Sequence, residues 1–171
     1  MLKKEVNLLK SHRRKLVALF YVNLTSMENL AENKRAGFDY EILEKFSAGV
    51  ELIGHEVKSA KMGHFNLAGA HAIIRNGEVY ILGASIPSFQ PGNAPENYDS
   101  ERTKKLLLKQ EEIKYLLGKT KSGLTLVPTR AYTNRGLIKI EIALARGRKK
   151  SDKRELIKKR ETEREIRRIS Q

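Results

Sequence analysis

The sequence contains no cysteine and no long hydrophobic run. Without cysteine, the chain has no disulfide scaffold, no thiol nucleophile and no cysteine-ligated zinc site. No apolar segment approaches the roughly 18 residues that a membrane-spanning helix needs, so we expect no membrane partner. What remains is a chain of 171 residues, 40% of them hydrophobic, which is enough for one globular domain with tails around a single core.

Residue patterns typical of catalysis and metal binding are missing as well. His55, His64 and His71 do not have the i, i+4 spacing that pairs two metal ligands on a helix. The glycine-flanked segment 118–123 looks like a phosphate-binding loop, but it lacks the Gly-Lys-Ser/Thr order at the required distance. We therefore predict that the protein is not an enzyme and uses no metal or cofactor.

Basic residues outnumber acidic ones by 34 to 20, and they are unevenly distributed. Residues 1–26 carry six basic residues and one acidic residue, and residues 146–171 carry twelve and five. The segment between them is nearly neutral, with sixteen basic and fourteen acidic residues. Basic ends favour a polyanionic partner, because Lys and Arg near phosphates release condensed counterions. The alternative is a surface charge that only keeps the protein soluble.

The charge differences divide the chain into a basic extension over 1–26, a globular domain over 27–145 and a basic tail over 146–171. In the extension, a basic start precedes an apolar run of seven residues, which is too short for a signal peptide and is followed by no cleavage site. We hypothesise that Met27 is the natural start and that 1–26 is an upstream read-in. Peptides from 1–26 in mass spectra of the native protein would contradict this hypothesis.

Hydrophobic residues of period two predict strands in the globular domain. Alternation from Phe38 indicates a strand that Ser47-Ala48-Gly49 interrupts and that resumes at Val50. A short helix is expected over 54–63. Two hairpins follow from their turn residues: one over 72–81 around Asn76-Gly77, and one over 124–144 around Asn134-Arg135-Gly136.

A proline-rich loop over 87–98 precedes a predicted helix. Asp99 or Ser100 is the expected N-cap, and Leu106, Ile113 and Leu117 form one helical face that ends before Gly118. The whole pattern is mainly β with inserted helices. About six short antiparallel strands favour an OB-fold-like barrel, which closes its own edges.

The tail over 146–171 has too little apolar surface to fold alone, so we expect it to be disordered when free. It has no proline after 128 and no glycine after 147, and Lys, Arg and Glu are good helix formers. We therefore predict that the tail becomes helical when bound to a phosphate-rich surface.

Four segments resemble, as an ordered set, the SsrA-binding protein (small protein B) family. They are LAENKRA at 30–36, GHEVKS at 54–59, DSERTKKLLL at 99–108 and ALARGRKKSDKR at 143–154. The resemblance runs from about Met27 to Ile169. It implies a monomeric factor of the bacterial cytoplasm that binds transfer-messenger RNA (tmRNA, or SsrA RNA) and delivers it to stalled ribosomes for trans-translation. The barrel would hold the tRNA-like domain, and the tail would occupy the empty mRNA channel near the small-subunit decoding centre.

The resemblance also implies functional residues. Those expected to bind RNA are Asn33, Lys34, Arg35, Glu56, Lys58, Ser59, Lys104, Lys105 and Leu107. Those expected to contact the ribosome are Gly147, Arg148, Lys149, Lys150, Asp152, Lys153, Arg154 and Ile169. Two alternatives stay open from the residues themselves: Leu107 as a core residue, and Glu56 as a structural salt bridge or cap.

Three positions depart from the family pattern: Ser47 replaces an acidic residue, Ser151 replaces a stacking side chain, and Thr162 stands where an aromatic is usual. Two other functions also stay open. One is an OB-fold RNA-binding or ribosome-associated protein without preference for tmRNA. The other is an enzyme that uses His55 or His71.

Overall fold

The computed structural model describes residues 28–90, 92, 95 and 97–169, so the hypothesis about 1–26 lies outside the described residues. Within this range the chain forms seven strands and four helices. In chain order they are β1 (Asn29–Glu32), α2 (Ala36–Asp39), β2 (Tyr40–Val50), α3 (Gly54–Lys61), β3 (His71–Arg75), β4 (Glu78–Leu82), β5 (Lys104–Leu107), α4 (Gln110–Lys121), β6 (Thr125–Asn134), β7 (Leu137–Gly147) and α5 (Lys150–Ile169).

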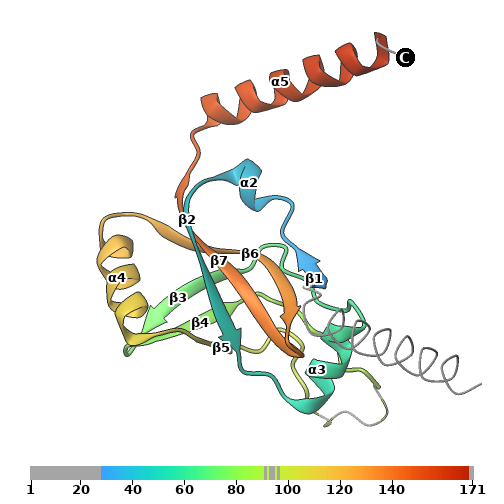
Figure 1. The fold of residues 1–171 in the computed structure, drawn as a ribbon, viewed down its shortest axis with the longest axis vertical. Helices are drawn as coiled ribbons and strands as arrows, with labels where there is room; N and C mark the ends of the chain where they lie inside the picture. Colours follow the sequence, from blue (N-terminus) through green and yellow to red (C-terminus); the bar gives the residue numbers. More distant parts are fainter. Residues whose placement is uncertain (1–27, 91, 93–94, 96, 170–171) are drawn as a thin grey trace, which may run out of the picture.

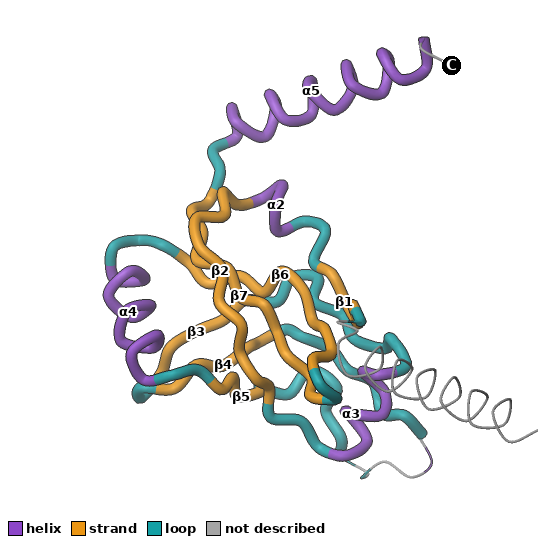
Figure 2. Tube along the Cα trace, viewed as in Figure 1, coloured by secondary structure: helices purple, strands orange, loops and turns teal. Residues whose placement is uncertain are grey.

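The strands form a closed antiparallel barrel (Figures 1 and 2). Their order is β1-β6-β3-β4-β5-β2-β7, and β6 also pairs with β7, which closes the sheet. Closure leaves few unpaired strand edges at this chain length. The mainly β barrel with inserted helices predicted from the sequence is therefore confirmed, with β1 as an additional strand that the sequence pattern did not reveal.

The barrel core follows from period-two patterning of the strands. Along β7, Ile138, Ile140 and Ile142 are buried and alternate with the more exposed Lys139 and Glu141. Side chains from the other strands and from α4 complete one cluster, which includes Val79, Ile81, Leu106, Leu116, Leu126 and Leu144. The same alternation gives the barrel an outer face of polar side chains on β2, β6 and β7.

Both predicted hairpins are confirmed by their backbone angles. Asn76 and Gly77 have φ values of 52° and 74°, as a two-residue type I′ turn between β3 and β4 requires. Arg135 and Gly136 have φ values of 51° and 78° between β6 and β7. The left-handed conformation at each turn sets the strand register, and with it the face on which each side chain lies.

The strand prediction around residue 40 was wrong in two places. Phe38 lies in the short helix α2, and β2 begins only at Tyr40. The strand also continues through Ser47-Ala48-Gly49. Ala48 is fully buried in the barrel, and a Cβ on Gly49 would lie 3.4 Å from the Leu107 side chain. Small residues here mark tight packing of β5 on β2 rather than a break.

The prediction of a helix beginning at Asp99 or Ser100 was also wrong. Leu106 lies in strand β5, where it pairs with Val50 of β2 and Val79 of β4. Tertiary pairing thus overrides the helical spacing of the leucines. Helix α4 starts after Lys109, whose backbone N–H donates to Glu112, and runs on through Gly118. The short helix α3 is confirmed, and Gly63 follows it with a φ of 83°.

Helix α5 projects away from the barrel beside α2 (Figure 1). Strand β7 continues to Gly147, so the first two residues assigned to the tail are part of the barrel. The helical conformation expected of the bound tail is the one described, and disorder of the free tail stays a prediction. Among the described residues, no helix combines the length and the apolar character needed to cross a bilayer.

Candidate nucleic-acid interface

The outer side of β2, β7 and β6 presents a row of polar and charged side chains. Lys45 and Ser47 alternate on β2 with Phe46 and Ala48, which pack toward the core. The register places Ser47 opposite Glu141 and Gly49 opposite Lys139. We call this surface the charged barrel face. It comprises Lys45, Ser47, Arg130, Lys139 and Glu141, together with Tyr132, which is buried beneath the Arg130 guanidinium.

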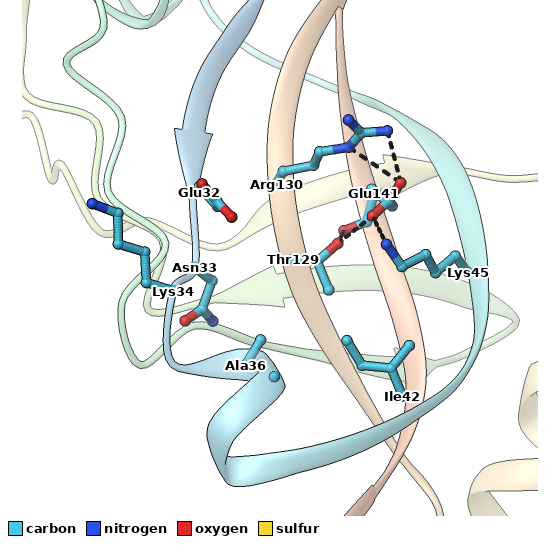
Figure 3. A pocket seen from close by; sticks show the side chains of 10 residues that line it. Glu32, Asn33, Lys34, Ala36, Ile42, Lys45, Thr129, Arg130 and Glu141 are labelled. Carbon is cyan, nitrogen blue, oxygen red and sulfur yellow. Dashed lines mark hydrogen bonds and ion pairs between the residues drawn. The ribbon is translucent and has the colours of Figure 1, made fainter. Parts of the chain in front are cut away.

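Glu141 organises one end of the charged barrel face (Figure 3). Lys45 and Arg130 each approach its carboxylate at 3.0 Å, and the Thr129 hydroxyl donates to it at 2.7 Å. Burial raises the pKa of Glu141, but the hydrogen bonds of Thr129 and Lys45 and the charge of Arg130 outweigh burial and keep the pKa below its usual range. One carboxylate thus fixes two cations beside a surface pocket of about 400 Å³.

The pocket continues to Asn33 and Lys34, at the junction of β1 and α2. The Asn33 side-chain amide donates to the Pro128 carbonyl at 3.1 Å, and its backbone N–H donates to the Thr129 carbonyl at 2.8 Å. Asn33 therefore fastens this junction to β6. Lys34 is exposed, and it points away from the Glu141 cluster (Figure 3). Arg35 is also exposed and approaches Asp39 at 3.6 Å.

Ser47 and Tyr132 occupy the middle of the charged barrel face. Their hydroxyl groups lie 2.6 Å apart, and the Arg130 guanidinium lies over the Tyr132 ring at 5.1 Å. The resemblance noted in the sequence implies an acidic residue at position 47, where this chain has serine. A serine at this position keeps a polar contact with Tyr132 and adds no negative charge to the face.

An apolar groove of about 230 Å³ lies beyond Gly49. Its lining includes Val50, Leu52, Val57, Leu107 and Leu137. Leu107 is 55% exposed and Leu137 is 66% exposed, so the alternative of Leu107 as a core residue is wrong. Aliphatic side chains beside Lys139 form an apolar surface against which unpaired bases can pack.

Three residues predicted to bind RNA are instead buried at the α3 end of the barrel. Glu56 is fully buried, and its carboxylate accepts hydrogen bonds from Arg102 at 2.5 and 2.8 Å and from the Ile53 backbone N–H at 2.9 Å. Burial raises the pKa of Glu56, but the Arg102 and Ile53 hydrogen bonds together lower it below its usual range. The Tyr98 hydroxyl also donates to Glu56, at 3.3 Å. Glu56 therefore caps α3 and forms a structural ion pair with Arg102.

Lys104 and Ser59 are buried as well. The Lys104 ammonium donates to the carbonyls of Ala84, Ser100 and Arg102 at 2.8, 3.0 and 3.0 Å, and burial lowers its pKa. Because their side chains are buried, Glu56, Ser59 and Lys104 present no surface to RNA, and a supporting role fits the structure better than the predicted contact.

The other predicted cations at this end lie at the surface. Lys105 is paired with Glu78 of β4, whose carboxylate raises the Lys105 pKa. Lys58 is exposed on α3. Sequence reasoning missed Lys45, Arg130, Tyr132, Leu137 and Lys139. Their positions at period two in three predicted strands were the signal that could have placed them on one face.

The root of the tail is tied to the barrel at several points. The Arg148 backbone N–H donates to the Asp39 carbonyl at 3.0 Å, and the Arg148 Nε donates to the Tyr40 carbonyl at 3.2 Å. Asp152 caps α5 by accepting from the Lys149 N–H at 3.2 Å. The Ser151 hydroxyl and the Lys149 N–H keep the pKa of Asp152 below its usual range.

The remaining predicted tail residues differ in exposure and position. Lys153 pairs with Asp39 of α2 at 2.6 Å. Those exposed to solvent are Gly147, Lys149, Lys150 and Arg154. Ile169 is the last residue of α5, and its side chain lies outside the described part of the structure.

His55, His64 and His71 lie among the described residues and gather with no other candidate metal ligands there. Within 28–90, 92, 95 and 97–169, no three His, Cys, Asp or Glu side chains gather as metal ligands. His55 packs edge-on against the Tyr98 ring at 4.5 Å, with a buried and unpartnered Nε2. His71 is exposed at the start of β3.

A closed barrel with a charged outer face, an apolar groove and a projecting basic helix defines a class of small proteins suited to binding nucleic acid. Comparison with known proteins gives the family. A sequence model described as "SmpB protein" matches residues 30–171. The chain belongs to the SmpB family.

Individual relatives agree with this family. The SsrA-binding protein of Thermosipho melanesiensis is 51% identical over 143 residues, covering 82% of this chain and 97% of the relative. The SsrA-binding protein of Synechococcus elongatus is 46% identical over 140 residues, covering 81% of this chain and 91% of the relative. A chain of the solved structure "tmRNA-SmpB: a journey to the center of the bacterial ribosome" is similar with a TM-score of 0.58 and 43% identity, over 70% of this chain and 84% of that one.

Proposed function

We propose that this protein binds tmRNA and delivers it to stalled ribosomes for trans-translation. The observation that carries the proposal is the similarity to a chain of the tmRNA-SmpB structure, at 43% identity over 84% of that chain. The relatives named SsrA-binding protein, which share about half of their residues with this chain, support the same function. The partners are tmRNA and the ribosome, and the place of action is the cytoplasm.

In this proposal the charged barrel face and the apolar groove hold the tRNA-like part of tmRNA. Lys45, Arg130 and Lys139 supply cations for phosphates, and Lys34 and Arg35 extend the positive surface toward the tail. Leu107 and Leu137 supply an apolar surface for splayed bases. Glu56, Ser59 and Lys104 support this surface from within, and Lys58 and Lys105 lie at its α3 end.

The basic helix α5 occupies the vacant mRNA channel near the decoding centre. It carries nine Lys or Arg residues and five acidic residues over twenty positions. A positively charged rod that leaves the barrel at one end can follow ribosomal RNA while the barrel keeps its own RNA. The protein acts as a monomeric binding factor and contributes no catalysis of its own.

Competition binding tests this proposal. We expect the full chain to bind tmRNA tightly at physiological salt in the presence of excess bulk tRNA. Binding that is equal for both RNAs and erased by salt would contradict the proposal and favour a general RNA-binding barrel. Loss of an enzymatic turnover in His55→Ala or His71→Ala variants would favour the enzyme alternative instead.

A further inference from the structure

The Asp152-Lys153-Arg154 motif at the start of the tail does not act as one unit. Asp152 caps α5 by accepting from the Lys149 N–H at 3.2 Å. Lys153 turns back toward the barrel, with its Nζ 2.6 Å from Asp39 Oδ1. Arg154 is exposed. Within one helical turn the three side chains thus face the helix backbone, the barrel and the solvent.

The Asp39–Lys153 pair is partly shielded from water. The Asp39 side chain is 26% exposed and the Lys153 side chain is 33% exposed. The Lys153 ammonium also lies 5.8 Å from the centre of the Phe38 ring, within the range of a cation–π contact. The hydrogen bond from Lys153 lowers the pKa of Asp39, and the Arg35 charge adds to this effect. Asp39 is therefore ionised at neutral pH and is placed to hold the first turn of α5.

A second attachment lies five residues earlier. The Arg148 backbone N–H donates to the Asp39 carbonyl at 3.0 Å, and the Arg148 Nε donates to the Tyr40 carbonyl at 3.2 Å. Attachment at Arg148 alone would fix where the tail leaves the barrel but not its direction. Attachment at Arg148 and Lys153 together fixes a direction, because two points define an axis.

The direction matters because α5 is long. Twenty helical residues extend about 30 Å, so a tilt of roughly 15° at the base displaces the far end by about 8 Å. A displacement of this size is close to the width of a helix. A factor that holds one RNA on its barrel and reaches a second site with its tail depends on this angle.

We propose that Asp39 is a positioning residue for the tail, and that Lys153 acts on the barrel through Asp39 rather than on the ribosome. The functional consequence rests on the proposed function: loss of this pair lowers ribosome rescue and leaves tmRNA affinity unchanged. The orientation of α5 itself needs no RNA, and it is measured on the protein alone.

The absence of cysteine allows a direct distance measurement. Spin labels on Lys114→Cys in α4 and Glu165→Cys near the far end of α5 report the angle of the helix by pulsed electron resonance on the full chain. The Asp39–Lys153 anchor should order the free tail more than its composition alone predicts, so we expect a narrow distance distribution in the parent protein and a broad one in Asp39→Asn. Lys153→Met should broaden it equally, and the double variant should add nothing further. Glu41→Gln, which removes a more exposed pair with Arg146 at 3.9 Å, is the matched control and should leave the distribution narrow.

Unchanged distance distributions in Asp39→Asn, or additive effects of the two substitutions, would overturn the proposal.

In a rescue assay on a truncated message, we expect Asp39→Asn and Lys153→Met to lose roughly two- to fivefold activity, in keeping with a partly exposed pair. Equal losses with unchanged tmRNA affinity support the positioning role. If Lys153→Met lowers rescue and Asp39→Asn does not, Lys153 contacts the ribosome and the proposal is wrong. If the distances change as expected and the parent does not bind tmRNA, the proposed function fails and the helix anchor stands.

Discussion

Two ion pairs have almost the same length and different surroundings, one beside α3 and one beside α2, which lie at opposite ends of the barrel in Figure 1. Arg102 meets Glu56 at 2.5 Å at the α3 end, and Lys153 meets Asp39 at 2.6 Å beside α2. The Glu56 side chain is fully buried, whereas the Asp39 side chain is 26% exposed. The distance between the charged atoms therefore does not distinguish a pair that stabilises the fold from the pair that we propose to orient α5. Burial does, because an uncompensated charge is costly only where water cannot reach it.

Removal of the Glu56 carboxylate should give the largest change in stability. Glu56→Ala leaves the Arg102 guanidinium and the Ile53 N–H without their acceptor, so we expect a loss of about 3–5 kcal/mol in the free energy of unfolding. Denaturant unfolding measures this loss. Glu41→Ala, at a 51% exposed side chain, is the control and should change stability by less than about 1 kcal/mol. Equal losses in the two variants would remove the distinction between buried and exposed pairs.

Lys104 gives a second comparison between a buried and an exposed cation on one strand. Lys104→Met should cost about 2–3 kcal/mol, because the carbonyls of Ala84, Ser100 and Arg102 lose their donor. Lys105→Met removes only the surface pair with Glu78 and should lower stability much less than Lys104→Met. Thermal unfolding of the two variants checks this difference. A stable Lys104→Met variant with weakened RNA binding would restore the contact role that we removed from Lys104.

Acidification should lower the stability of the protein through protonation of Glu56. The pKa of Glu56 in the folded protein lies below the ordinary value of 4.5, so its stabilisation is present above that value and is lost as the pH falls through the folded pKa. We therefore expect parent stability to fall below about pH 4.5. Glu56→Gln should start less stable and fall less steeply on acidification. A parallel pH profile would show that Glu56 is not the linked group.

The smallest effects are expected on the charged barrel face. Lys45→Ala should weaken tmRNA binding by a few-fold and reduce the slope of log affinity against log salt by about 1, with little change in stability. Lys121→Ala, an exposed lysine at the end of α4, is the matched control and should change neither quantity. Filter binding at several salt concentrations measures both. Equal effects of the two substitutions would mean that positive charge acts without regard to its place on the barrel.

The sequence was sufficient for the parts of the fold that depend on local chemistry. Asn76-Gly77 and Asn134-Arg135-Gly136 specified their turns because left-handed backbone angles restrict the residues that fit. Leu106 was misassigned because its spacing to Ile113 and Leu117 is helical, although the residue lies in a short strand that only its pairing with β2 and β4 reveals. Ser47-Ala48-Gly49 looked like a break because close packing between strands is invisible in a single sequence.

The residues predicted to bind RNA fall into an exposed group and a buried group. Lys34 and Leu107 are exposed, as RNA contacts must be, while Glu56, Ser59 and Lys104 of the same motifs are buried. Residue type alone does not show whether a charged side chain is exposed or buried. A buried charge needs a partner, and that partner often comes from a distant segment of the chain. Arg102 lies forty-six residues from Glu56, and nothing in the local pattern links them.

The central claim is that the barrel holds tmRNA and the tail serves the ribosome. The most direct test is the tmRNA affinity and rescue activity of a chain that lacks 149–171, which keeps the Arg148 hydrogen bonds to the barrel. We predict tmRNA affinity within a few-fold of the full chain in excess bulk tRNA, together with loss of rescue on a truncated message. Loss of tmRNA binding on removal of the tail would make the tail the main RNA anchor and would contradict the account.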